Sequence, residues 1–222
     1  MNKIYDALRG LFGHDPANPD APGPVLVDPG EILFTLPTLA DDAPIVEPLT
    51  DAPPRHGLVL HEDDWRQLEF LPAAQLPESQ RLLRDFKTFE ATHREASGWR
   101  QAYPRVLSDG IVIPGVAAEA ELVAALGATP EPTPLICTSE TVLGCLAGGF
   151  SVPIGNEVTL YGYTNAAGIA VLGASLGEHA DHQCLVQAFC ALNARYGVVL
   201  VDWCQQRVIV GQGKQGLNVW QA

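Results

Sequence analysis

A concentration of proline between His14 and Pro54 sets the strongest limit on how this chain can fold. Ten of the 18 prolines lie in this segment, together with eight acidic residues and neither Lys nor Arg. Proline fixes φ and removes a backbone donor, so regular elements here can only be short. We therefore predict an extended, Pro-rich acidic arm over residues 14–54 that is partly wrapped on a core formed by residues 55–222.

The residues before the arm predict a short amphipathic docking helix over residues 1–13. Their apolar side chains recur at helical spacing, and Gly13 follows as a stop signal. These side chains are Ile4, Tyr5, Leu8, Leu11 and Phe12. An isolated helix of this length is marginal, so we expect it to dock on its own domain, on another subunit or on a partner.

Beyond residue 55 the pattern predicts strands in adjacent pairs, separated by helices. Hairpins are expected at 56–71, 157–172 and 198–210, and long helices at 77–98 and 178–195. The remaining expected elements are a helix at 117–126, a strand at 134–137 and a small apolar helix that begins at Ser139. Because adjacent strand pairs imply antiparallel pairing, the predicted class is α+β, with antiparallel hairpins packed with two long helices.

Two stretches of the chain resemble each other. An apolar strand leads to Asp64-Trp65-Arg66-Gln67 in one, and a similar strand leads to Asp202-Trp203-Cys204-Gln205 in the other. This repetition is compatible with two related subdomains, 55–127 and 134–222. Chance resemblance between two hairpins is the alternative, because apolar strands resemble one another readily.

The formal charge of −13 argues against two classes of partner. Nucleic acids and anionic membranes bind clustered Lys and Arg, and an acidic surface repels both. Eight of the 13 basic residues are concentrated in residues 55–105. We therefore expect this basic region to receive the acidic arm within the same molecule, and any external partner to be a protein.

The compartment expected from the sequence is a bacterial-type cytoplasm. Asp6 and Arg9 interrupt the apolar run that a secretory signal would need, and no run of about 18 apolar residues could span a membrane. The five cysteines form no CxxC pair, so reduced and mostly buried thiols are expected.

Four residues are weak candidates for chemistry. His179 and His182 are three residues apart on an expected helix, as metal-binding histidines can be, but the acids around them suit a helix-capping turn. Cys184, or Cys145 within the sequence GCLAGG, could act as a nucleophile with one of these histidines, although the GxSxG motif is absent. We expect neither a metal nor a cofactor.

The residues that we predict to bind a partner lie in the two similar stretches. Glu62, Asp63, Asp64 and Trp65 form a dense acidic turn, and Asp202-Trp203 repeats its last two residues. Tryptophan beside acidic residues suits a basic protein partner.

The function expected from these features is that of an acidic, non-enzymatic protein-binding domain with an adaptor, immunity or accessory role. A small hydrolase or transferase with a Cys nucleophile and a His is one alternative, which leaves catalysis open. A homo-oligomeric structural protein is the other.

Overall fold

A computed structural model describes residues 33–49, 57–212 and 216–222, and within them strands dominate. Strand accounts for 39% of the structure and helix for 27%, with three α-helices and an eight-stranded antiparallel sheet. The predicted α+β packing of hairpins against two long helices is therefore wrong. It underestimated the strands because several pair with partners distant in sequence. The expected docking helix at 1–13 lies outside the described residues.

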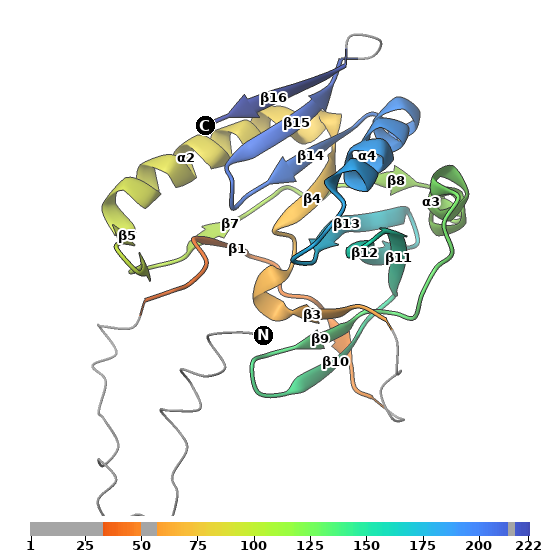
Figure 1. The fold of residues 1–222 in the computed structure, drawn as a ribbon, viewed down its shortest axis with the longest axis horizontal. Coiled ribbons are helices and arrows are strands. Elements are labelled where there is room, and N and C mark those ends of the chain that lie inside the picture. The colour runs from red at the N-terminus through yellow and green to blue at the C-terminus, as the bar shows by residue number, and fades with distance from the viewer. Residues whose placement is uncertain (1–32, 50–56, 213–215) are drawn as a thin grey trace, which may run out of the picture.

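The large sheet forms the centre of the molecule (Figure 1). All of its strand pairs are antiparallel, in the order β11-β12-β13-β4-β14-β15-β16, and β8 pairs with one end of β13. Its strands are β4 (Leu68–Pro72), β8 (Ile113–Pro114), β11 (Gly149–Gly155), β12 (Val158–Asn165), β13 (Gly168–Leu176), β14 (Val198–Asp202), β15 (Arg207–Gly211) and β16 (Leu217–Gln221). Both stretches suggested as subdomains contribute strands to it.

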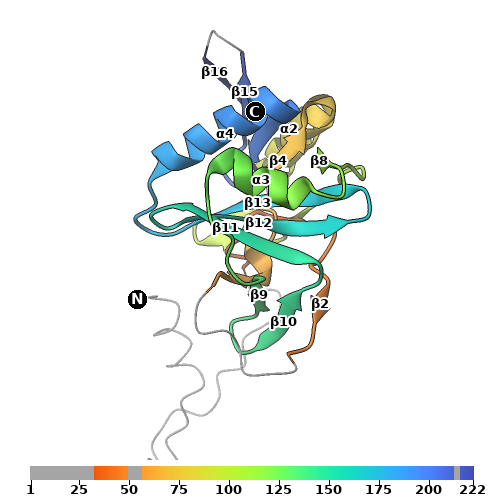
Figure 2. The same ribbon diagram turned by 90° about the vertical axis from the view of Figure 1, so that its right-hand side faces the viewer.

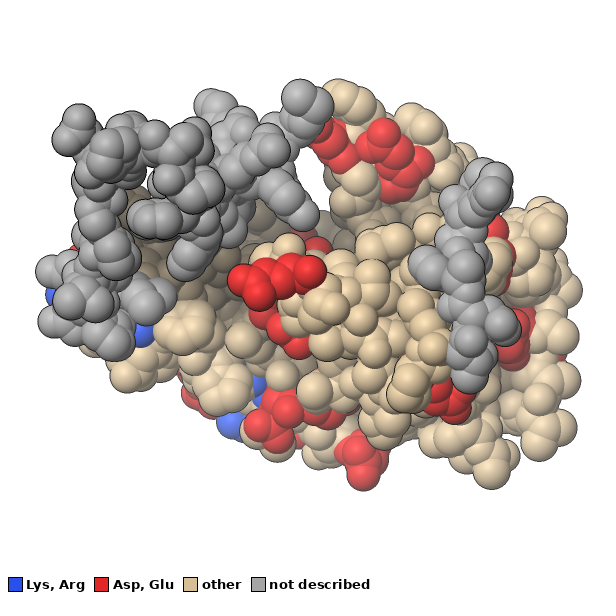
Figure 3. Space-filling view, turned by 90° about the horizontal axis from the view of Figure 1, so that it is seen from below, with Lys and Arg blue, Asp and Glu red and all other residues tan. Residues whose placement is uncertain are grey.

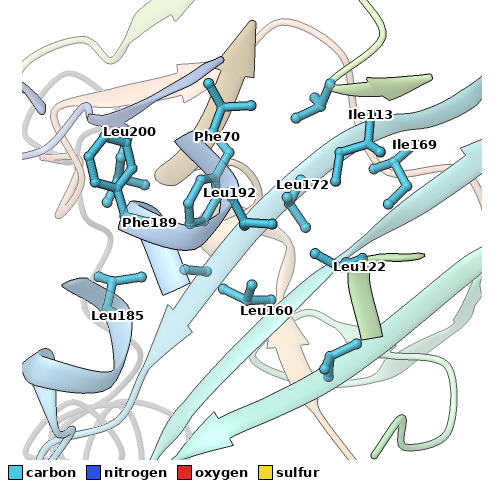
Figure 4. Packing of buried hydrophobic residues seen from close by; sticks show 14 of the residues in the cluster. Phe70, Ile113, Leu122, Leu160, Ile169, Leu172, Leu185, Phe189, Leu192 and Leu200 are labelled. Carbon is cyan, nitrogen blue, oxygen red and sulfur yellow. The ribbon is translucent and has the colours of Figure 1, made fainter. Parts of the chain in front are cut away.

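The α-helices cover this sheet on both faces. α3 (Ala118–Leu126) and α4 (His182–Tyr196) pack on one face, and α2 (Leu76–His93) packs on the other, against β14 and β15 (Figures 1 and 2). Figure 4 shows the core under α3 and α4, where Phe70, Leu172 and Phe189 meet. None of the helices in the described ranges is long and apolar enough to cross a bilayer.

Because both faces of the sheet are covered, its central strands are apolar on both sides. In β4, Phe70 faces the core under α3 and α4 while Leu71 faces α2. In β12, Leu160 faces the first core, and Tyr161 faces a separate small sheet. Continuous apolar runs such as Val198–Val201 follow from this arrangement, since successive side chains point to opposite faces.

The small sheet lies against the face of β12 and β13 that the helices α3 and α4 do not cover (Figure 2). Its order is β2-β10-β9-β3. The strands are β2 (Val46–Glu47), β3 (Val59–His61), β9 (Leu135–Cys137) and β10 (Val142–Leu146). Its inner side chains Leu60, Ile136 and Leu146 pack against Trp65 and Tyr161.

Two sequence predictions fail at this sheet. The hairpin at 56–71 is wrong, because β3 pairs in parallel with β9 and β4 pairs within the large sheet. The short 3-10 helix Glu62–Asp64 separates the two strands. The small helix after Ser139 is also wrong. Thr138 Oγ1 accepts the backbone N–H groups of Glu140 and Thr141, and this tight turn returns the chain as β10.

Short pairings attach the described part of the arm to the rest of the molecule. β1 (Thr38–Ala40) pairs in parallel with β7 (Tyr103–Arg105), and β2 pairs with β10. A second short pair, β5 (Arg94–Glu95) with β6 (Gly98–Trp99), follows α2. The 3-10 helix Ala73–Gln75 precedes α2.

Other elements match their predictions closely. The helices expected at 77–98 and 117–126 correspond to α2 and α3, although α2 ends at His93 because the chain continues into the β5–β6 pair. The hairpins at 157–172 and 198–210 correspond to β12–β13 and β14–β15. α4, however, begins at His182 rather than at 178, because Asp181 caps it by accepting the backbone N–H of Gln183 at 3.0 Å.

Candidate functional site

The two similar stretches of sequence meet in space. Asp64 and Gln67 from the first and Asp202 and Gln205 from the second line one cavity of about 300 Å³. The backbone N–H of Trp203 donates to the carbonyl of Gln67 at 3.1 Å, which joins the two stretches directly. Four of the six predicted binding residues thus lie at this junction or pack beneath it: Asp64, Trp65, Asp202 and Trp203.

Both tryptophans are buried, so neither ring forms part of the surface. Trp65 packs against Tyr161 and stacks on Tyr163, with ring centroids 5.7 and 6.4 Å away. Trp203 instead lies among charges. Its Nε1 donates to Glu69 Oε1 at 2.7 Å, and the guanidinium of Arg105 lies 5.0 Å from its ring centroid.

Glu69, on β4, is the centre of a buried charged network. Besides Trp203, its carboxylate accepts a hydrogen bond from Arg66 Nε at 2.7 Å. Arg66 Nη1 also contacts both carboxylate oxygens of Asp42, each at 2.7 Å. The last contact joins an arginine that precedes the basic helix α2 to an acid of the arm. Burial lowers the pKa of Arg66, but Glu69 and Asp42 raise it by more.

Arg105, the second cation of this network, is only 2% exposed. It donates through Nη1 to Thr38 Oγ1 and Gln67 Oε1, and through Nη2 to the carbonyl of Arg66. Its buried Nε has no partner among the described residues. Burial lowers the pKa of this guanidinium, and Glu69 opposes the shift.

Tyr161 holds the turn that carries Arg66. Its hydroxyl accepts the backbone N–H of Arg66 at 3.0 Å and donates to the carbonyl of Asp64 at 3.2 Å. Arg66 has φ of 56°, a left-handed conformation that costs free energy for any residue except glycine. Gly173 leaves room for this tyrosine, since a Cβ there would lie 2.6 Å from its Cζ.

The acids of the turn differ in exposure. Glu62 and Asp64 are exposed and Asp63 is half-buried, and His61 Nδ1 accepts the backbone N–H of Asp63 at 3.2 Å. Asp64 lines the cavity described above, where burial raises its pKa. Burial likewise raises the pKa of Asp202 across the same cavity. These two carboxyl groups are therefore easier to protonate than free aspartic acid.

The structure does not join the candidate cysteines and histidines into a catalytic pair. Cys184 donates from Sγ to Asp181 Oδ2 at 3.2 Å, and this hydrogen bond raises the thiol pKa, whereas a nucleophile needs it lowered. His182 begins α4, and His179 precedes it on an exposed loop. Cys145 lies on β10, between Leu135 and Glu47. Among described residues, no group of three or more His, Cys, Asp or Glu is placed to hold a metal ion.

Sequence reasoning missed the most buried members of the charged network. Glu69 carried a signal, because it interrupts the apolar run Leu68–Leu71, and a carboxylate inside such a strand requires partners. No feature of the sequence predicted that Arg105 is buried, because it follows Tyr103-Pro104 at the end of a short strand without periodicity. Its partners Thr38 and Gln67 lie far away in the sequence.

Several large aliphatic side chains on and beside the small sheet are exposed. Ile45, Val59, Val142 and Leu143 are all exposed and lie on its strands or directly before β2. The backbone of Ile45 extends the pairing, because its carbonyl accepts the N–H of Ala147 at 2.8 Å. These four residues are called the apolar patch below.

Acidic residues surround the apolar patch. Glu47 is on β2, Glu62 and Asp63 follow β3, and Glu140 is in the turn between β9 and β10. Hydrogen bonding between His61 Nε2 and Ser139 Oγ, at 3.2 Å, holds that turn beside the end of β3. Figure 3 views the molecule from this side and shows acidic side chains spread around an uncharged surface.

Comparison with known proteins returned no similarity: no family model matches the chain, and neither a curated protein nor a solved structure resembles it detectably.

Proposed function

We propose that this chain is a non-catalytic protein-binding domain, with an adaptor, immunity or accessory role, and that it binds its partner through the apolar patch. The observation that carries this proposal is the exposure of four large aliphatic side chains on one small sheet. Contiguous exposed apolar surface with a polar rim is typical of a protein-interaction site. Such a surface gains free energy when a partner removes it from water.

The charges around the apolar patch select the chemistry of the partner. Strands β2, β3, β9 and β10 and the 3-10 helix after β3 contain neither Lys nor Arg, while Glu47, Glu62, Asp63 and Glu140 lie at their edges. A partner that presents Lys or Arg around an apolar centre matches this pattern. A second copy of the same face does not, because like charges would be brought together. This argument favours a different protein over the homo-oligomeric alternative.

A reducing compartment suits this role, and we propose the cytoplasm. All five cysteines are free, and Cys190 is exposed. Exposed thiols persist in reduced form where glutathione and thioredoxin systems operate.

The proposal is tested by capturing partners from a lysate at low salt and then measuring the affinity of the purified partner by calorimetry. Val59→Ser removes part of the apolar patch, and we expect roughly tenfold weaker binding, as for a moderate interface hot spot. Val219→Ser is the matched control, because Val219 is 55% exposed on β16 whereas Val59 is 58% exposed on β3. Glu140→Lys should slow association and reduce the salt dependence of binding.

Equal binding by wild-type and Val59→Ser proteins would contradict this use of the apolar patch. Binding that Val219→Ser weakens to the same degree would place the interface elsewhere. A partner without a basic surface would refute the charge argument even if the apolar patch is used.

A further inference from the structure

A second, larger cavity lies away from the apolar patch, between the segment 106–112, the end of β4 and the strands β12 and β13. Its volume is about 680 Å³, within the range of small-molecule sites. The side chains that line it include both apolar groups and charged groups of each sign. The apolar groups include Leu71, Ile111 and Val171, and the charged ones are Asp41, Asp42, Arg66, Arg105 and Asp109.

The cations of this cavity are buried and its acids are exposed. The Arg66 side chain is 11% exposed and Arg105 is 2% exposed, whereas Asp41, Asp42 and Asp109 all lie at the surface. The positive charge therefore lies deeper than the negative charge. A ligand matches this arrangement if its carboxylate reaches the buried arginines while its cationic group stays near the exposed acids at the mouth.

The buried network beside the cavity is short of negative charge. Arg66 pairs with the one buried carboxylate, that of Glu69, whereas the buried Arg105 makes its hydrogen bonds to the uncharged acceptors of Thr38, Gln67 and the Arg66 backbone. The remaining counter-charge comes from Asp42, whose side chain is 50% exposed. Buried cations need a compensating anion, but a half-exposed carboxylate gains little from holding that position. Asp42 is thus a counter-ion that another carboxylate could replace.

Unused donors support the same conclusion. Within the described residues, Arg66 makes its hydrogen bonds through Nε and Nη1, and none is found for Nη2. Arg105 Nε is buried without a partner. Guanidinium groups bind carboxylates through two parallel N–H bonds, so Arg66 has a free donor beside the one that Asp42 occupies.

We propose that this cavity binds a small zwitterion of the amino-acid class, whose carboxylate replaces Asp42 on Arg66 and whose ammonium group lies between Asp41 and Asp109. Inorganic phosphate fits less well, because it would meet the three acids at the mouth. A simple amine fits less well, because it would meet the two arginines. Asp42 acts as an internal competitor that holds the site while no ligand is bound.

The test measures thermal stabilisation, and then calorimetric affinity, for each standard L-amino acid with the full-length wild-type protein and with Asp42→Asn. Removing the competing carboxylate should tighten binding by up to about fivefold, the upper range for an exposed ion pair. Asp109→Asn should weaken binding of the same amino acid. Asp85→Asn is the control, since Asp85 forms an exposed ion pair with Arg81 on α2, outside the residues that line this cavity.

The matching amine without a carboxylate, and inorganic phosphate, complete the set of probes. We expect neither to bind as tightly as the amino acid. The proposal is overturned if no amino acid stabilises either protein, if the amine or phosphate binds equally well, or if Asp42→Asn binds no tighter than the wild-type protein. None of these results depends on the apolar patch, so the two proposals stand or fall separately.

Discussion

The two Asp-Trp segments share a sequence pattern but differ in what surrounds the tryptophan. Trp65 follows a 3-10 turn between the two sheets and packs on Tyr161 and Tyr163, and its Nε1 is buried without a partner among the described residues. Trp203 follows β14 in the large sheet, where its Nε1 donates to a buried carboxylate and its face covers a buried arginine. One ring therefore fills an aromatic core, and the other holds a charged network together.

The backbone of the two segments also differs. The residue in the left-handed conformation is Arg66 in the first segment, directly after the tryptophan, and Gln206 in the second, three residues after it. The turns consequently aim their side chains differently, although Asp64 and Asp202 both reach the same cavity. A short sequence pattern can thus repeat an approximate position in a fold without repeating an environment.

The largest loss of stability is expected from removing the charge of Glu69, the carboxylate that accepts the hydrogen bond of Trp203 Nε1. Glu69→Gln removes the buried charge that pairs with Arg66 and offsets that of the nearby Arg105, and should lower the free energy of unfolding by about 3–5 kcal/mol. Denaturant unfolding measures this loss. Asp42→Asn, at the exposed end of the same network, should cost below about 1 kcal/mol. Similar losses in the two variants would show that the network is not centred on Glu69.

The next largest loss of stability is expected from replacing the tryptophans themselves, which compares the two rings directly. Trp203→Phe removes a hydrogen bond to a charged acceptor and should cost about 2–3 kcal/mol. Trp65→Phe loses apolar contact but also removes a buried donor that has no described partner. Its cost in unfolding free energy should therefore be about 1 kcal/mol smaller than that of Trp203→Phe. Equal losses of unfolding free energy would indicate that the rings contribute only through packing.

The sequence predicted local structure better than it predicted contacts. The helix α2 and the hairpin β14–β15 follow from periodicity and turn residues close to them in the chain. β3, in contrast, pairs with β9 far along the sequence, and nothing within 56–71 shows that preference. Prediction of the site was limited in the same way, because the sequence does not show which distant segments meet. The acidic turn at 62–64 was visible as a pattern, whereas the meeting of Asp64 with Asp202 depends on β4 lying beside β14.

A smaller effect is expected at Tyr161, which anchors only the first segment. Tyr161→Phe keeps the ring on Trp65 but leaves the backbone N–H of Arg66 and the carbonyl of Asp64 without their shared partner. We expect a loss of about 1–2 kcal/mol in unfolding free energy, as for other buried hydrogen bonds. Hydrogen exchange of the Arg66 amide should increase more than that of β14 amides. Uniform acceleration would mean that the tyrosine stabilises the whole core and not this turn.

The smallest effect concerns the two carboxyl groups that the segments share across the cavity. Burial raises the pKa of Asp202 above that of the unfolded chain, so the native state binds more protons between the two pKa values. Stability from this group therefore falls as pH rises through that window, and above it the cost of the buried charge remains. Asp202→Asn should remove this dependence, because an amide does not titrate. Its oxygen can still accept the N–H of Gln205, which Asp202 accepts at 2.8 Å.

Asp64→Asn should change the pH dependence of stability in the same direction, since burial raises the pKa of Asp64 too. Unfolding measured at several acidic pH values checks both, and a wild-type slope retained in both variants would place the responsible protons elsewhere.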